Sequence, residues 1–341
     1  TAFRALALLA AHPEPFTAVR AVPRGPHPAS ARGAARPARP RRRPPPSGAT
    51  AWPPPLERHP MSESYTLRRV RGMDEIRECG TLQKLAWGPD FGELVPPAIL
   101  WAAQEVGGVT ACAFDAAGRM AGFVFGMTGV RDGRLAHWSD LLVVRPEIRD
   151  RGLGARLKRF QRDELLRLGV GIVYWTFDPL ESKNAYLNFN RLGITARDYR
   201  RDLYGHTGSP VHEGIGTDRL VAEWEIDSER VHRRLSGEAP APNAEEIAAL
   251  PLVNETRRSP VGLESLEPDL SLDADRVRIA IPVDIQRLKT QALDLAADWR
   301  ARTRVAFEAY LGRGYRVVEL VREGERSCYV LERGGLSPVE A

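Results

Sequence analysis

The segment Leu141–Leu168 constrains the fold of this chain more than any other. It reads LLVVRPEIRDRGLGARLKRFQRDELLRL: an apolar strand at Leu141–Val144, a proline turn, a basic loop with two glycines and an amphipathic helix. Gly152 and Gly154 stand where the helix begins, and glycine there lets backbone N–H groups approach an anion closely. Because the first N–H groups of a helix have no internal partner, its N-terminus favours negative charge. This order predicts a phosphate-binding loop.

The helix that follows the glycines has a clear apolar side. Its large apolar residues recur three to five positions apart, at Leu153, Leu157, Phe160, Leu165 and Leu168. The spacing predicts that this side covers a sheet and that the charged residues between them, Lys158 among them, face outward. In the preceding loop, Arg149 and Arg151 supply positive charge for an anionic ligand.

The glycines alone fit several kinds of phosphate site. A Rossmann loop needs a third glycine where Leu157 stands, and the Gly-Lys-Ser/Thr of a P-loop is absent. Residues Arg149–Gly154 read R-D-R-G-L-G, and an L-x-V-x-P pattern precedes them at Leu142, Val144 and Pro146. Together these residues resemble the R-x-x-G-x-G signature of the GNAT superfamily of acyl-CoA-dependent N-acyltransferases.

The resemblance extends over about residues 65 to 227 and implies the GNAT fold. That α/β fold has a mixed central sheet, flanked by helices, which splays between its central strand and the next one. The hydrophobic patterns agree, since they predict the order β-α-α-β-β-β-α-β-α-β-β with the central strand at 135–144. The next strand, at 170–177, is a near-continuous apolar run, which predicts burial on both of its faces.

A GNAT protein takes acetyl-CoA or succinyl-CoA as co-substrate, and the resemblance assigns its binding to the central strand, the loop and a later helix. Asn184 and Asn188 are four residues apart, so we expect both amides on one side of that helix. The cofactor-binding residues that we predict are Leu142, Val143, Val144, Arg149, Asp150, Arg151, Gly152, Leu153, Gly154, Asn184 and Asn188. The first three cover the strand segment where the family's backbone oxyanion donor lies, at a bulge.

The segment from Thr176 to Gly193 departs from the family pattern. A tyrosine that reprotonates the departing thiolate usually stands four residues before the glycine, but this chain has Phe189 there. A general base is also needed, because an aliphatic ammonium group is mostly protonated at neutral pH. Asp140 on the central strand is the first candidate, although a salt bridge would explain it equally well. The other acid or base candidates are Tyr204, His212 and Tyr199.

The run DPLESKNAYLNFNRLG, with a later YG and GTDR, resembles a GNAT subgroup found alongside N-succinylamino acid racemases. It implies a succinyl donor and an amino acid acceptor, and a succinyl group needs a nearby cation from Lys183, Arg191 or Arg219. We therefore expect an N-acyltransferase that moves an acetyl or succinyl group to the amine of a small molecule. The alternative, which Phe189 motivates, is a non-catalytic acyl-CoA-binding regulatory protein.

The first 60 residues differ in composition from the rest of the 341-residue chain. They hold ten arginines, no lysine and two acidic residues, a charge of +8, whereas the whole chain carries +5. Fourteen of the 27 prolines lie here, so we expect this leader to be disordered. It could be a basic arm, an organelle presequence or the product of a mis-set start before Met61. We favour the last, and expect no nucleic-acid partner.

The remaining patterns set broad expectations. Cys79, Cys112 and Cys328 are isolated, which predicts neither a metal site nor disulfides and favours the cytoplasm. No apolar run reaches membrane-spanning length. We divide the chain into the leader 1–60, an acyltransferase domain 61–230, an irregular linker 231–275 and a strand-helix-hairpin extension 276–333. A homodimer is kept open.

Overall fold

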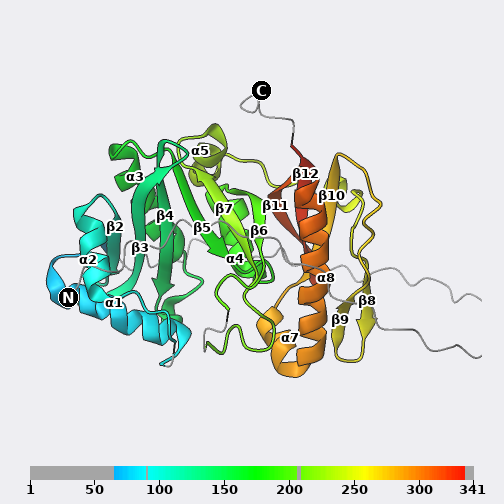
Figure 1. Cartoon of the computed structure of the whole chain (residues 1–341), viewed down its shortest axis with the longest axis horizontal. Helices are drawn as coiled ribbons and strands as arrows, with labels where there is room; N and C mark the ends of the chain where they lie inside the picture. Colours follow the sequence, from blue (N-terminus) through cyan, green and yellow to red (C-terminus); the bar gives the residue numbers. More distant parts are fainter. Residues whose placement is uncertain (1–64, 90, 206–208, 335–341) are drawn as a thin grey trace, which may run out of the picture. The chain divides into compact units, whose positions relative to one another are not determined.

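The computed structural model describes residues 65–89, 91–205 and 209–334, so the Pro/Arg-rich leader lies outside the described part. That part has the predicted mixed α/β class. A ten-stranded sheet runs in the order β1-β2-β3-β4-β5-β7-β6-β11-β12-β10, with helices on both of its faces (Figure 1). β4 and β5 run parallel, and the other adjacent strands of this sheet run antiparallel.

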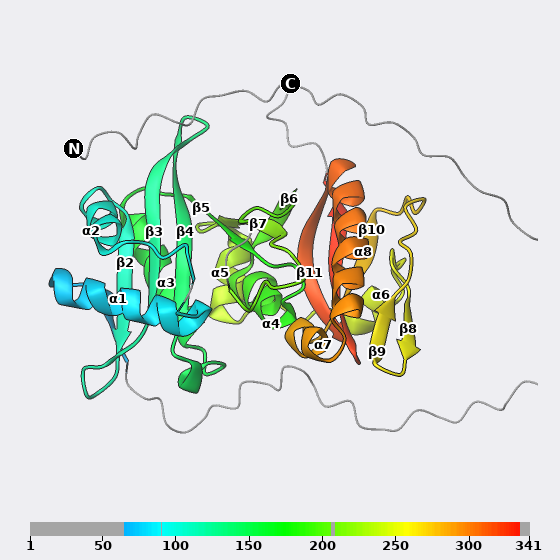
Figure 2. The same cartoon turned by 60° about the horizontal axis from the view of Figure 1, so that its bottom comes forward.

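The first half of the sheet follows the predicted element order. Its elements are β1 (Thr66–Arg69), α1 (Gly72–Trp87), α2 (Pro97–Glu105), β2 (Val109–Phe114), β3 (Met120–Arg131) and β4 (Arg134–Val144). Alternate residues of β2 pack into two separate cores: Ala111 with α3 (Leu153–Arg167), and Cys112 with α1 and α2. Successive side chains of a strand point to opposite faces of the sheet, so each face packs against its own layer of helices. Figure 2 shows β3 and β4 projecting beyond their neighbours as a long hairpin.

The next elements complete the first half of the sheet. They are β5 (Ile172–Phe177), α4 (Ser182–Tyr186), a π-helix (Leu187–Leu192), β6 (Thr195–Arg200) and β7 (Arg219–Glu225). The prediction that β5 is buried on both faces was wrong. Val173, Trp175 and Phe177 are buried, but the residues between them are only half-buried. The reason is that Tyr174 and Thr176 belong to the face where the hydroxyl of Thr176 meets that of Tyr204.

The splay that we predicted between the central strand and the next one is confirmed. β4 and β5 pair over only three positions, the last of which joins Trp138 to Tyr174. β4 continues to Val144 and β5 to Phe177 without pairing with each other. We call this unpaired region the divergence. It leaves backbone groups on one edge of β4 without a partner strand.

The strand-helix-hairpin of the last third is confirmed, with the long helix broken at Ala292. Its elements are β10 (Arg276–Pro282), α7 (Ile285–Gln291), α8 (Leu293–Gly312), β11 (Tyr315–Glu323) and β12 (Arg326–Arg333). Residues 231–275, predicted as irregular, contain the end of α5 (Glu229–Ser236), all of α6 (Ala244–Ala248) and the hairpin of β8 (Thr256–Ser259) and β9 (Gly262–Ser265). These elements are too short to give a clear periodic pattern.

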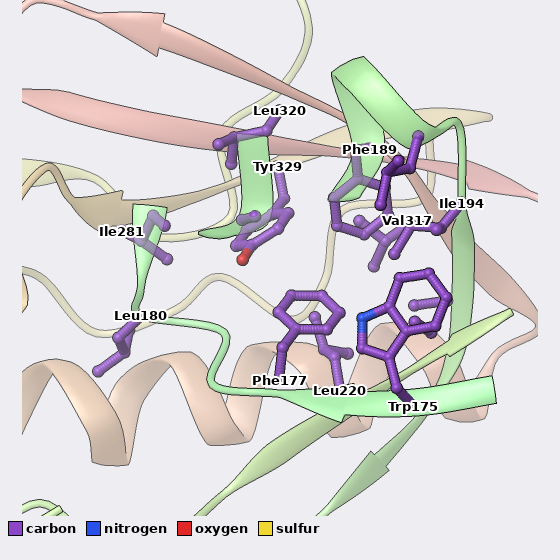
Figure 3. Close-up of a cluster of buried hydrophobic side chains, with 14 of the residues drawn as sticks. Trp175, Phe177, Leu180, Phe189, Ile194, Leu220, Ile281, Val317, Leu320 and Tyr329 are labelled. Carbon is purple, nitrogen blue, oxygen red and sulfur yellow. The ribbon is translucent and has the colours of Figure 1, made fainter. Parts of the chain in front are cut away.

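The two halves of the sheet meet at a narrow seam. β6 and β11 share one paired position, Ala196 with Val317. Aromatic side chains pack across it, because Phe189 of the π-helix lies edge-on to Phe177 at 5.9 Å and to Tyr329 of β12 at 5.7 Å (Figure 3). The hydrophobic core, rather than backbone pairing, therefore holds the halves together.

Candidate functional site

The loop between β4 and α3 has the backbone of an anion site. After a short 3-10 helix (Pro146–Ile148), Asp150 takes a φ of 63° and Gly152 a φ of 80°, in the left-handed region. Left-handed backbone is costly for a residue other than glycine, and such strain clusters at functional sites. α3 then begins at Leu153, and its N-cap residue, Gly152, has no side chain that could accept a hydrogen bond from the helix. The first N–H groups of α3 therefore have no side-chain cap.

Gly154 lies in the first turn of α3, where packing does not require a glycine. A methyl group at this position would meet Leu142 at 3.6 Å and Val144 at 4.0 Å, both ordinary contacts. Its backbone is also ordinary, since its φ is not positive. The protein interior thus gives no reason for glycine here, whereas close approach of a ligand to the helix N-terminus would give one.

The charged residues of the loop lie at its surface. Arg149 and Arg151 are exposed, and Arg149 donates to the carbonyl of Val144 at 3.2 Å. Asp150 pairs with Lys183 at 3.0 Å, which connects the loop to α4. Both partners are largely exposed, so the pair adds little stability. It does bring Lys183 beside the loop that we predicted to bind phosphate.

β4 has a bulge at Asp140, because Leu141 pairs with Phe125 while Ser139 pairs with Gly126. The structure therefore places the bulge just before the predicted segment Leu142–Val144. A bulge resets the alternation of a strand. Consequently Ser139 lies on the α3 side, where it contacts Gln161.

Asp140 is exposed, yet its pKa is raised above the ordinary value. The surrounding protein displaces water from the carboxylate, and the negative charge of Glu93 adds to this effect. A hydrogen bond from the side chain of Trp138 acts in the opposite direction. A carboxylate that holds its proton more tightly is also a stronger base. Asp140 is therefore a stronger base than an ordinary aspartate, and its role as the general base stays a prediction.

Tyr204 and His212, the other catalytic candidates, lie together around Arg219. The hydroxyl of Tyr204 is 2.7 Å from that of Thr176, and the guanidinium of Arg219 lies over the Tyr204 ring at 5.2 Å. Arg219 also donates to Nε2 of His212 at 2.8 Å. Burial and the charge of Arg219 lower the pKa of His212 to about 4, so this ring is neutral at pH 7. Tyr199 instead donates to Asp218 at 2.5 Å.

Behind this group lies a buried ion cluster that was not predicted. Asp178 accepts from Arg300 of α8 at 2.6 Å, and Arg219 approaches the same oxygen at 3.7 Å. All three side chains are at most 7% exposed. The only signal in the sequence was an aspartate at the end of a buried strand, which did not reveal a partner more than 120 residues away.

The structure separates the two predicted amides. Asn184 is exposed, whereas Asn188 is 2% exposed and its Nδ2 has no acceptor among the described residues. The helix changes from α to π at Leu187, and this change alters which residues share a side. The prediction that both amides present one surface was therefore wrong: of the two, Asn188 is the one whose buried amide donor finds no acceptor among the described residues.

Lys158, which we predicted on the outer side of α3, is 3% exposed. It is buried together with Gln161, which is fully buried. The signal was present, because Gly154, Lys158, Gln161 and Leu165 follow the spacing of one helical face. It was missed because three of these four residues are not large apolar ones.

A cavity of about 560 Å³ lies between α1 and the turn that joins β2 to β3. Three arginines line it, and each is paired with a carboxylate: Arg68 with Glu75, Arg145 with Glu78 and Arg119 with Asp115. These arginines are therefore already neutralised, unlike the N-terminus of α3.

Two further searches concern only residues 65–89, 91–205 and 209–334. In this part no group of three or more His, Cys, Asp or Glu residues could hold a metal ion. Nor does it contain a helix both long and apolar enough to cross a membrane.

No protein-family model and no curated protein matches the chain. Among solved structures it is similar to the ribosomal-protein-S18-alanine N-acetyltransferase from Escherichia coli, with 17% identity, a TM-score of 0.39, and coverage of 48% of this chain and 96% of that one. It is also similar to Arabidopsis thaliana Naa50 in complex with the bisubstrate analogue CoA-Ac-MVNAL, with 17% identity, a TM-score of 0.38 and coverage of 47% and 97%. At these values no residue role is transferred to this chain.

Proposed function

We propose that this protein is a GNAT-type N-acyltransferase that moves an acyl group from acyl-CoA to the amine of a small molecule. The observation that carries the proposal is the adjacency, along β4, of the divergence and the uncapped N-terminus of α3. A diphosphate at that N-terminus would meet backbone N–H groups and the positive end of the helix dipole. The pantetheine arm would continue along the unpaired edge of β4.

In this proposal, three parts of the site share the binding of the coenzyme. The loop from Arg149 to Gly154 holds the diphosphate, with Lys183 beside it. Leu142–Val144 offer backbone groups on the edge of β4 that faces the divergence. Asn188 contributes a buried amide donor that has no acceptor within the part of the chain that the structure describes. Such a donor would be costly unless a ligand or water accepted from it.

The acceptor amine must lose a proton before or during its attack on the thioester carbonyl. Asp140 is the base that we propose, because its carboxylate is exposed beside the divergence and its pKa is raised. The carbonyl oxygen gains negative charge in the transition state, and backbone N–H groups of β4 just after the bulge would stabilise it. Tyr204 and His212 would then contact the acceptor rather than act as the base.

The finer parts of the proposal concern the two substrates. We keep acetyl-CoA and succinyl-CoA as donors, and amino acids among the acceptors, as in the succinyltransferase subgroup that the sequence resembles. A cytoplasmic location and a homodimer belong to the same proposal.

The experiment uses the full chain with acetyl-CoA or succinyl-CoA and a pool of amino acids and other small amines. Release of free thiol is measured, and mass spectrometry identifies the acylated amine. We expect thiol release that depends on both an amine and the chain. If isothermal titration calorimetry detects no binding of CoA, the proposal is wrong.

A second candidate, a non-catalytic acyl-CoA sensor, is favoured by one observation. Phe189 occupies the position where a GNAT enzyme usually has its acid, and it is completely buried among other rings. Binding of CoA without thiol release in the experiment above would support the sensor.

A further inference from the structure

Lys158 is a buried amine that the mechanism above does not use. Its Nζ donates to Oγ of Ser139 at 2.8 Å and to Oε1 of Gln161 at 3.1 Å, and lies 3.8 Å from the centre of the Trp175 ring. The described residues thus provide two oxygen acceptors for its three N–H groups. None of these partners carries a negative charge. A buried ammonium group without a carboxylate is costly, so a position of this kind calls for an explanation.

The position of this amine coincides with the start of the divergence. Trp138 and Tyr174 form the last pair between β4 and β5, and the next residue on each strand contacts Nζ: Ser139 on β4 and Trp175 on β5. Nζ therefore lies where the two strands part. In the proposed function, this is the inner end of the pantetheine arm and hence the place of the sulfur.

The neighbours of Lys158 hold the amine in place. Ser139 donates to Gln161 at 3.0 Å, so the amide of Gln161 must donate to Nε2 of His137, 3.1 Å away. The other ring nitrogen of His137 then donates to Thr128 at 2.9 Å. Each hydrogen bond in this series, from Lys158 to Thr128, thus has a defined donor and acceptor, and a connected network of this kind is rigid. It keeps Nζ at the divergence.

The proton donor expected from the family pattern is absent. Phe189 has no polar atom in its side chain, and Figure 3 shows it among carbon atoms of Phe177, Val317 and Tyr329. The hydroxyl of Tyr329 cannot readily replace it, since it donates to the carbonyl of Pro179 at 2.7 Å. A departing thiolate would therefore find no acid on the π-helix.

We propose that Lys158 is the catalytic acid that protonates the sulfur of coenzyme A as the thioester breaks, which rests on the function proposed above. The amine nitrogen attacks the carbonyl carbon and forms the C–N bond, and Asp140 takes the amine proton. The C–S bond breaks with its electron pair on sulfur, and the Lys158 ammonium gives one proton to that sulfur. The products are the amide and CoA thiol, and solvent then deprotonates Asp140 and reprotonates Lys158.

The groups around Lys158 favour easy release of its proton. It is faced by His137 and Ser139 of β4, Gln161 of its own helix, Trp175 of β5 and Trp224 of β7, none of which is acidic. Burial lowers its pKa well below the usual value for lysine. Turnover should accordingly fall as the pH rises through this lowered pKa, because Lys158 then loses the proton that it would give to the sulfur.

The test compares the full-length Lys158→Met variant with the wild type, using acetyl-CoA and the amine identified above. We expect kcat to fall by about 10²- to 10⁴-fold, the usual effect of removing an acid. KM for acetyl-CoA should stay within about 3-fold, and the alkaline limb should disappear from what activity remains. Arg159→Met is the control on the same helix, because it also removes a positive charge, but from an exposed side chain that donates to the carbonyl of Leu235 away from the divergence. It should keep kcat within about 3-fold of wild type.

Three results would overturn the assignment while leaving the acyltransferase function intact. They are a kcat of Lys158→Met within about 3-fold of wild type, equal losses in the two variants, or a wild-type profile flat up to about pH 10. The last measurement needs no variant, so it decides the matter even if Lys158→Met does not fold. A wild-type chain that binds CoA but never releases thiol would instead refute the proposed function itself.

Discussion

At the scale of single residues, environment rather than residue type distinguishes the candidates. Asp140 and Asp178 are both aspartates at or near the divergence. Asp178 is buried against Arg300 and Arg219, as a structural ion group requires. Asp140 is exposed and has a raised pKa, with Glu93 rather than a cation among its causes. Only the second arrangement leaves a carboxylate available to take a proton.

Replacement of Asp140 by asparagine should separate activity from stability. We expect thiol release to fall by about 10²- to 10⁴-fold at pH 7, because the base is lost. Since the folded protein raises the pKa of Asp140 above its unfolded value, the charged form disfavours folding at neutral pH. The variant should therefore unfold at the same urea concentration as the wild type or a higher one. A destabilised but active variant would contradict this role.

The wild-type pH profile provides an independent check on Asp140. The base works when deprotonated, so activity should fall as pH decreases through its raised pKa. This acid limb should be absent from the residual activity of Asp140→Asn. If the limb persists, another group is the base.

At the scale of elements, α3 shows both what the sequence predicted and what it missed. Its start after the glycines and its packing on the sheet follow from local pattern. The composition of its inner face did not follow from local pattern. Lys158 and Gln161 are polar residues, and their burial depends on partners on β4, Ser139 and His137. Long helices and strands were predictable because their apolar residues recur over several periods. The elements between 231 and 275 are too short to show such a recurrence. Contacts between distant segments, such as Asp178 with Arg300, leave no periodic trace.

The first turn of α3 offers a direct test of the coenzyme site. Gly154→Leu should weaken CoA binding at least tenfold in calorimetry, since the side chain would occupy space that the diphosphate needs. Its backbone is already helical, but its side chain would lie against Leu142 and Val144, so the urea midpoint is measured alongside to separate loss of binding from loss of stability. Gly312→Leu near the end of α8 is the matched control: this glycine is also helical, and a methyl group there meets nothing within 4 Å. Equal CoA affinity in both variants would argue against the site.

At the scale of the whole molecule, the last third of the chain is part of the site's support. α8 brings Arg300 to Asp178 at the end of β5, and Arg300 also donates to the carbonyl of Ile215 at 3.0 Å. This helix therefore fixes both a strand that borders the divergence and the loop that carries His212. The sequence pattern predicted this extension as a separate unit and did not reveal its contacts with Asp178 and Ile215.

Removal of this connection should destabilise the fold. Arg300→Met breaks a buried ion pair and should lower the free energy of unfolding by about 3–5 kcal/mol in urea titrations. Arg302→Met is the control on the same helix, because its partners Glu267 and Asp298 are mostly exposed. It should cost less than about 1 kcal/mol. Similar losses for the two variants would mean that the pair with Asp178 has no special role.

The single paired position between β6 and β11 has a practical consequence. Few backbone bonds would have to reform if the gene were divided within the exposed connection around residues 238–243. Two separately expressed pieces, 1–240 and 241–341, would then expose matching aromatic surfaces and should recombine when co-expressed, as a split reporter does. The connection between residues 240 and 241 is therefore a site at which the chain could be split, so that a folded protein forms only when both pieces are present.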